Sequence, residues 1–135
     1  MAEVKVHLHQ ISPSTTEATI RTHKALVDRP VSKGGTDQGP MGGEYFLASI
    51  GGCFMSTLLA AIRARDASVT NIRAEVVGTM VDNPTRFTAV DIYVSADCED
   101  RDLLEKLVQI AENGCIMMNT LKGKMELSVR IEVTA

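Results

Sequence analysis

The fold is decided by the stretch YFLASIGGCFMSTLLAAIRAR, residues 45–65, which carries no charged side chain between Tyr45 and Ile62. An apolar run this long is too long for a strand and predicts a central helix over residues 45–65. Apolar residues lie on nearly every side of that helix, so other elements must cover most of it. A chain of 135 residues can hardly do so alone, which favours a dimer.

The same stretch approaches the length of a membrane span, because residues 45–62 are all uncharged. Gly51, Gly52 and several hydroxyl side chains dilute its hydrophobic character. We therefore expect a buried core helix and no membrane partner.

Strands are predicted on both sides of the central helix. Val4, Val6 and Leu8 alternate with polar residues, which is the period of a strand. Residues 29–43 hold five glycines and two prolines and are predicted to form a loop. Further strands, each with alternating or β-favouring composition, are expected over residues 18–23, 24–28, 72–80, 90–96 and 125–133.

An amphipathic second helix is predicted over residues 100–113, ended by Gly114, with a short apolar turn over 116–121. The resulting order is βββ-α-ββ-α-β. Hairpins and long helices without repeated βαβ units favour the α+β class, with antiparallel sheets around the long central helix. The length predicts a single domain over residues 1–135.

Composition excludes several classes of protein. A net charge of −3 argues against a nucleic-acid binder, which needs a basic face. Aromatic residues make up only 4% of the chain and Trp is absent, so a stacking platform for bases is not expected. The first ten residues lack a basic segment followed by an apolar run, and three cysteines do not make a paired disulfide framework. A cytoplasmic protein with reduced thiols is expected.

Cys53 follows Gly51 and Gly52 inside the central helix. Two glycines cost a helix about 1 kcal/mol each relative to alanine, which suggests that a partner helix or a substrate approaches the backbone there. The alternative, favoured by spacing alone, is that Cys53 is a buried structural cysteine.

The other two cysteines occupy different surroundings. Cys115 follows the helix stop at Gly114, and a thiol at the start of a following helix is made more acidic by the helix dipole. The alternative is that Cys115 serves packing, since Ile116, Met117 and Met118 follow it directly. Cys98 lies among four carboxylates, which disfavour a thiolate, so we expect it to be the least reactive of the three.

Two further patterns carry little weight. His7 and His9 share one strand face, but no third metal ligand is evident, so a solvated strand face is the favoured interpretation. Gly34-Gly35-Thr36 lacks the rest of a phosphate-binding loop. No metal and no cofactor is therefore expected.

Two segments around the cysteines carry a resemblance to a known family. The first runs from Asp28-Arg29-Pro30 through Gly34-Gly35 to GPMGGEYFLASIGGC at residues 39–53, and the second is CIMMNTL at residues 115–121. Together they resemble the OsmC/Ohr family of osmotically inducible and organic hydroperoxide resistance proteins. The spacing of nine residues between Glu44 and Cys53 is that of the family, and the order of strands and helices also agrees.

The resemblance implies an intertwined homodimer with its central helices sandwiched between sheets. It implies a thiol-dependent peroxidase that reduces organic (alkyl or lipid) hydroperoxides, with Cys53 peroxidatic and Cys115 resolving. A dithiol reductant, such as a lipoyl protein or a thioredoxin-like protein, would reduce the Cys53–Cys115 disulfide. The family's Arg–Glu pair maps onto Glu44 and onto Arg21 as first choice or Arg29 as second.

The chain departs from the family pattern at two prolines, which are replaced by Gly42 and Ile116. Loss of the proline after the second cysteine bears on the position of the Cys115 thiol. The alternative function is therefore a non-catalytic redox-sensing or small-ligand-binding dimer of the same fold. A purely structural interaction domain with core cysteines is the third possibility.

Glu44 poses a geometric question. If residues 44–53 form one helix, nine residues rise about 13.5 Å and Glu44 cannot touch Cys53 of its own chain. We therefore expect Glu44 to lie off the helix or to serve the partner's site across a dimer. An apolar wall that favours bulky hydroperoxides is expected from Phe46, Phe54, Met55, Met117 or Met118.

Overall fold

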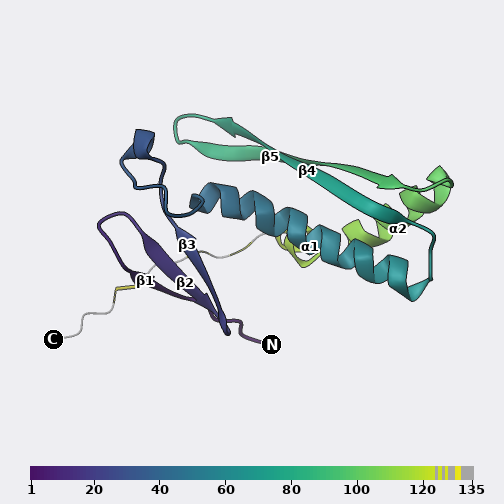
Figure 1. The fold of residues 1–135 in the computed structure, drawn as a ribbon, viewed down its shortest axis with the longest axis horizontal. Helices are drawn as coiled ribbons and strands as arrows, with labels where there is room; N and C mark the ends of the chain where they lie inside the picture. Colours follow the sequence, from purple (N-terminus) through teal and green to yellow (C-terminus); the bar gives the residue numbers. More distant parts are fainter. Residues whose placement is uncertain (124, 126, 128–129, 132–135) are drawn as a thin grey trace. The chain divides into compact units, whose positions relative to one another are not determined.

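The computed structural model describes residues 1–123, 125, 127 and 130–131 and divides into two compact units, residues 1–48 and 49–135. Its order of elements is βββ-α-ββ-α-α, and both sheets are antiparallel (Figure 1). The predicted α+β class with a long central helix is confirmed. The predicted single domain over 1–135 stays a prediction.

The first unit is built on a three-stranded sheet in the order β1-β2-β3, with β1 at His7–Gln10, β2 at Thr16–Ile20 and β3 at His23–Val27. Leu8 faces Ala18 across one pair, and Ala18 faces Ala25 across the other. Ala18 is the buried residue of this sheet. A short 3-10 helix, η1 at Val31–Lys33, interrupts the predicted loop.

Asp28 holds that loop against the sheet. The carboxylate is buried and accepts hydrogen bonds from the hydroxyls of Thr15 and Thr36 and from the backbone N–H groups of Arg29 and Gln38. Burial alone would raise the pKa of Asp28, but these four hydrogen bonds outweigh it and hold the pKa well below its usual range. The first unit is therefore fastened by an ionised carboxylate.

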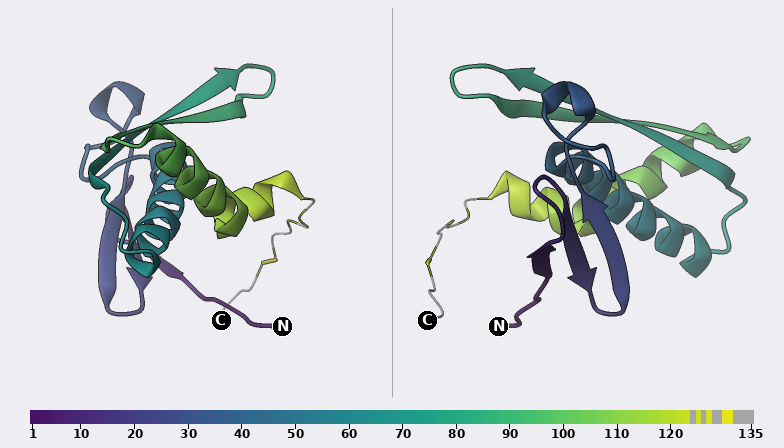
Figure 2. Two further views of the ribbon diagram at one scale, coloured as in Figure 1. Left: turned by 90° about the vertical axis from the view of Figure 1, so that its right-hand side faces the viewer. Right: turned by 60° about the vertical axis from the view of Figure 1, so that its left-hand side comes forward.

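The second unit packs two helices under a long hairpin. It contains α1 (Gly42–Ala64) from Ser49 onward, β4 (Thr70–Val81), β5 (Arg86–Asp97), α2 (Arg101–Gly114) and α3 (Ile116–Lys122). Both α1 and α2 lie on the same face of the β4–β5 hairpin (Figures 1 and 2). Residues along each strand alternate between half-buried and exposed, as the period-two pattern predicts.

The core of this unit lies between α1 and α2. Phe54 and Leu58 of α1 meet Leu107 and Ala111 of α2, and Cys115 completes the cluster. All five are at most 2% exposed. Asp100 caps the start of α2 by accepting a hydrogen bond from the Leu103 backbone N–H at 3.1 Å.

Two sequence predictions need correction or lie beyond the described residues. The turn expected over 116–121 is the helix α3, whose first turn closes with the Asn119 N–H donating to the Cys115 carbonyl at 3.0 Å. The segment is too short to show a period, and half-buried Met117 and Met118 tie it to the core. The final strand predicted over 125–133 falls mostly outside the described residues.

One face of α1 is covered and the other is not. Ile50, Phe54 and Leu58 are buried, and a Cβ added at Gly51 would lie 2.6 Å from Val76 Cγ2, so β4 is what approaches the backbone there. Gly52 is exposed on the opposite face. The expected cover on most sides is therefore not supplied by the described residues of one chain.

By length and composition alone α1 could cross a membrane, with a mean hydropathy of 1.7 over its most apolar window. A core helix passes the same test, and the buried side of α1 packs into the cluster around Leu58. The sequence-based expectation of a core helix is consistent with this packing.

Candidate active site

The second unit brings Cys53 and Cys115 together. Cys53 is half-buried on α1, one residue before Phe54 of the core. Cys115 is fully buried between α2 and α3, where its backbone forms the C-cap of one helix and the N-cap of the other. The Cys53 and Cys115 thiols lie close enough for each to shift the pKa of the other. Both cysteines are free thiols in this structure.

The surroundings of Cys53 favour its thiolate. Its pKa is lowered from the ordinary value, chiefly by a hydrogen bond from the Met117 backbone N–H, and further by the Cys115 thiol and the Ile116 N–H. Burial acts in the opposite direction but does not outweigh these donors. Cys53 is therefore the more nucleophilic cysteine of the pair.

Cys115 is held in its protonated form. Burial raises the pKa of the Cys115 thiol, and the hydrogen bond that it donates to Cys53 and the charge on Cys53 raise it further. Hydrogen bonds from the Met118 and Met117 N–H groups do not compensate. The pair is thus divided into one half-buried nucleophile and one buried proton donor.

This division has a direct chemical use. A thiolate with access to solvent can attack an electrophile, and a neighbouring thiol in contact with it can afterwards condense with the oxidised sulfur. A purely structural pair of core cysteines would not require one thiol to be acidic.

The other predicted site residues lie in the first unit. Glu44 lies in the first turn of α1, where its Oε1 accepts a hydrogen bond from the Met41 backbone N–H at 2.8 Å. The alternative that Glu44 lies off the helix is therefore wrong, because its carboxylate caps the helix start. Its service to a partner's site across a dimer stays a prediction.

The two candidate arginines sit in different local structures. Arg21 is exposed in the β2–β3 turn with a φ of 56°, a left-handed conformation that side chains other than glycine adopt at a cost. Arg29 is exposed in the loop, where its N–H and carbonyl are bonded to Asp28 and Asp37. Within the described residues, neither arginine forms an ion pair with Glu44.

The weaker candidates have local roles. Cys98 is half-buried and its Sγ donates to the Asp100 carbonyl at 3.2 Å. His7 and His9 are exposed on β1. Among the residues that the structure describes, no group of three His, Cys, Asp or Glu side chains is arranged to hold a metal ion.

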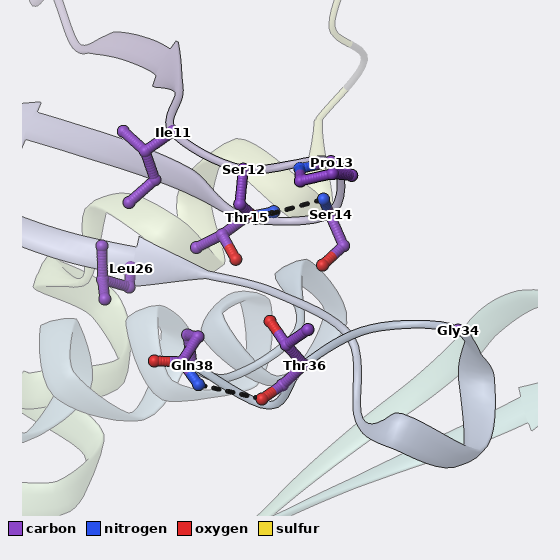
Figure 3. Close-up of a pocket in the computed structure, with 9 residues that line it drawn as sticks. All are labelled: Ile11, Ser12, Pro13, Ser14, Thr15, Leu26, Gly34, Thr36 and Gln38. Carbon is purple, nitrogen blue, oxygen red and sulfur yellow. Dashed lines mark hydrogen bonds between the residues drawn. The ribbon is translucent and has the colours of Figure 1, made fainter.

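A pocket of about 420 Å³ lies within the first unit. Figure 3 shows Thr15, Thr36 and Gln38 around it, with the Gln38 side-chain amide donating to the Thr36 carbonyl at 3.0 Å. The hydroxyls of Thr15 and Thr36 donate to the buried Asp28. The polar side chains of the pocket thus serve the loop anchor, and none of the predicted site residues lines it.

Comparisons with known proteins identify the family. The family model for OsmC-like proteins matches residues 35–130, which span both cysteines and Glu44. This chain belongs to the OsmC-like family. A search of curated proteins gives no match.

Solved structures share the fold of this OsmC-like protein. The OsmC-like protein of Mycoplasma pneumoniae superposes with a TM-score of 0.77 at 16% identity, covering 90% of this chain and 89% of that one. An organic hydroperoxide resistance protein of Elizabethkingia anophelis gives 0.68 at 17% identity, covering 93% and 92%. That of Bacillus subtilis gives 0.63 at 17% identity, covering 90% and 92%. At these identities the likeness shows the fold alone.

Sequence reasoning missed the backbone donors to Cys53. The N–H groups of Ile116 and Met117 at the start of α3 contribute to the site without any side-chain signature. One signal was present: residue 116 is Ile where the resemblance led us to expect proline, and only a residue other than proline has an N–H to donate. Position 116 thus keeps a backbone N–H that favours the Cys53 thiolate.

Proposed function

We propose that this OsmC-like protein is a thiol-dependent peroxidase that reduces organic hydroperoxides, with Cys53 peroxidatic and Cys115 resolving. The observation that carries the proposal is the contact between the two thiols, in which Cys53 has a lowered pKa and Cys115 a raised one. Names of fold relatives as organic hydroperoxide resistance proteins agree with it.

The reaction follows from the two protonation states. The Cys53 thiolate attacks the outer oxygen of R–O–OH, an S–O bond forms, and the O–O bond breaks. Cys53 becomes a sulfenic acid, and the alkoxide takes up a proton and leaves as the alcohol. The Cys115 thiol then condenses with the sulfenic acid to give the Cys53–Cys115 disulfide and water. A dithiol reductant restores both thiols by exchange and is itself oxidised to a disulfide.

The charged groups of the proposed site come from the first unit. Arg21, or Arg29 as second choice, stabilises the thiolate and the developing alkoxide, and Glu44 orients the guanidinium through a paired hydrogen bond. Because Glu44 lies on the same continuous helix as Cys53, nine residues earlier, we place this pair at the site of the other protomer in a homodimer.

The dimer is supported by the uncovered face of α1. Gly52, Ser56, Leu59 and Ala60 are exposed there and carry no charge. Leu59 is 47% exposed, although its neighbour Leu58 is fully buried. A second copy of the chain is the occupant that the family resemblance implies for this face. Cysteines that cycle through reduction fit a cytoplasmic location.

Preference for bulky hydroperoxides rests on the thioether side chains near Cys53. Met55, Met117 and Met118 are half-buried and pack against the same core cluster as Cys53. Phe54 is buried at 2% exposure and so belongs to the core; its expected place in a substrate wall is wrong. Flexible methionines adapt to varied alkyl groups, so we expect cumene hydroperoxide to react faster than hydrogen peroxide.

The test uses the reduced protein and one equivalent of cumene hydroperoxide, followed by intact mass and peptide mapping. We expect loss of two hydrogens with a Cys53–Cys115 linkage. Cys115→Ser should stop at a Cys53 sulfenic acid, and Cys53→Ser should not react. Cys98→Ser, the matched control, should behave as the unaltered protein. An unchanged mass of the unaltered protein would refute the peroxidase.

The same sample separates turnover from sensing. With dithiothreitol and excess hydroperoxide, an enzyme consumes many equivalents of peroxide per chain. Dithiothreitol would also reduce the disulfide of a redox-sensing dimer, so the two differ in rate: a sensor should consume hydroperoxide little faster than the Cys53→Ser variant. Multiple turnover is the result that the proposal requires.

A further inference from the structure

A close approach between α1 and the end of α2 lies beside the two thiols. Thr57 follows Cys53 by one helical turn, and its Oγ1 donates to the Cys53 carbonyl at 3.0 Å. Gly114 immediately precedes Cys115. A Cβ added at Gly114 would lie 3.1 Å from Thr57 Cγ2. The Thr57 methyl group therefore faces the Gly114 backbone at a point four residues after Cys53 and one residue before Cys115.

This approach leaves no room for a larger residue at position 114. Carbon atoms in contact settle at about 3.5–4.0 Å, so alanine at Gly114 would need several tenths of an ångström more space. Thr57 cannot yield freely, because a β-branched side chain in a helix has few rotamers and its hydroxyl is bonded to the preceding turn. The segment that follows Gly114 must move instead.

We propose that Thr57 and Gly114 are positioning residues that set the separation of the Cys53 and Cys115 thiols. The inference deepens the peroxidase proposal, on which its biological meaning rests. The segment after Gly114 carries the Cys115 thiol and the Ile116 and Met117 N–H groups that stabilise the Cys53 thiolate. A displacement at Gly114 therefore disturbs disulfide formation and thiolate stabilisation together.

Disulfide formation is the more sensitive of the two. The sulfur–sulfur bond is about 2.05 Å and the two Cβ atoms must lie about 3.5–4.5 Å apart. Deviations from this geometry strain the bond and make it more reducible. A shift of a few tenths of an ångström at Gly114 should accordingly weaken the Cys53–Cys115 disulfide about tenfold.

The experiment equilibrates the full-length protein with mixtures of glutathione and glutathione disulfide. Cys53 and Cys115 lose two hydrogens to glutathione disulfide, which becomes two glutathione molecules, and the oxidised fraction gives an equilibrium constant. Gly114→Ala should lower this constant about tenfold and should move the alkylation profile of Cys53 to higher pH. Gly123→Ala is the control, because its added Cβ would meet only ordinary contacts at 3.7 Å.

A second substitution, at Thr57, tests whether the Thr57 methyl group causes the effect of Gly114→Ala. Thr57→Ser removes Cγ2 but keeps the hydroxyl, so Gly114→Ala/Thr57→Ser should recover the equilibrium constant and the pH profile of the unaltered protein. If Gly114→Ala behaves as the unaltered protein, or if Thr57→Ser does not restore it, the proposal is overturned. Should Gly114→Ala fail to fold, recovery of a folded, oxidisable double variant supports the proposal, and failure of both overturns it.

No peroxide enters this measurement. A protein that lacks peroxidase turnover but shows the loss in Gly114→Ala and the rescue would refute the proposed function alone. A protein with full turnover and no response at Gly114 would refute the positioning role alone.

Discussion

The Cys53 and Cys115 thiols lie close enough for each to shift the pKa of the other, although the whole β4–β5 hairpin and α2 separate the two residues in the sequence. The buried thiol keeps its proton and the half-buried one is stabilised as a thiolate. This asymmetry gives each cysteine a different reactivity before any oxidant arrives.

The Ile116 backbone N–H offers a selective test of thiolate stabilisation. Ile116→Pro removes one donor to Cys53, and proline is well accepted in the first turn of a helix. We expect the pKa of Cys53 to rise, so its alkylation by iodoacetamide at neutral pH should slow and its alkylation profile should move to higher pH. Peptide mapping across a pH series measures the alkylation of Cys53.

Ile116→Ala is the matched control for that variant, because it keeps the N–H and Ile116 is 73% exposed. It should leave the alkylation profile of Cys53 unchanged. Equal profiles for Ile116→Pro and Ile116→Ala would contradict a role for this donor.

Arg21 can be separated from Arg29 by activity and stability together. Arg21→Gly relieves a φ of 56°, so stability should be unchanged or rise by up to about 1 kcal/mol. Hydroperoxide turnover should nevertheless fall about 10²–10³-fold, because one electrostatic donor to the transition state is lost. Arg29→Gln should have a smaller effect. The reverse order would assign the role to Arg29. Turnover with cumene hydroperoxide and thermal melts supply both readouts.

Ionisation of Asp28 makes the free energy of unfolding depend on pH. Its pKa is depressed in the folded chain, so its contribution is fully present above the unfolded value of about 3.9 and is lost as the pH falls towards the folded value. Asp28→Asn should lower the urea midpoint by a constant amount near neutral pH, and the difference from the unaltered protein should shrink below about pH 4. A pH-independent difference would show that charge at Asp28 contributes nothing.

Substitutions on the exposed face of α1 test the proposed homodimer. Leu59→Arg places a charge where Leu59 is 47% exposed, so the folded chain should persist while the dimer dissociates. Sedimentation velocity should then report a monomer. Leu58→Ala, in the adjacent buried position, should cost about 3–5 kcal/mol of stability without dissociating the dimer. A dimer that survives Leu59→Arg would exclude this face as its interface.

Most of the secondary structure could be read from local pattern. The period of two along β4 and β5, the apolar run of α1 and the cap and stop of α2 are properties of neighbouring residues, and their predicted positions agree with the structure to within a few residues. The helix α3 escaped prediction because seven residues are too few to show a period. Glu44 was placed off the helix as one alternative because nine helical residues would separate it from Cys53. The hydrogen bond that its carboxylate accepts from the Met41 N–H instead makes it part of the helix start.

Sequence by itself indicated the α+β class, the family and Cys53 and Cys115 as the candidate pair, because these depend on composition, local period and motif spacing. That Cys53 and Cys115 meet was implied by the resemblance alone. Tertiary structure decided that they do, and also which of them carries the lowered pKa. Proton affinity is set by the donors that surround a thiol, and here those donors are backbone N–H groups of α3. Every residue other than proline has such a group, so only the tertiary structure could show that the N–H groups of Ile116 and Met117 lie at Cys53.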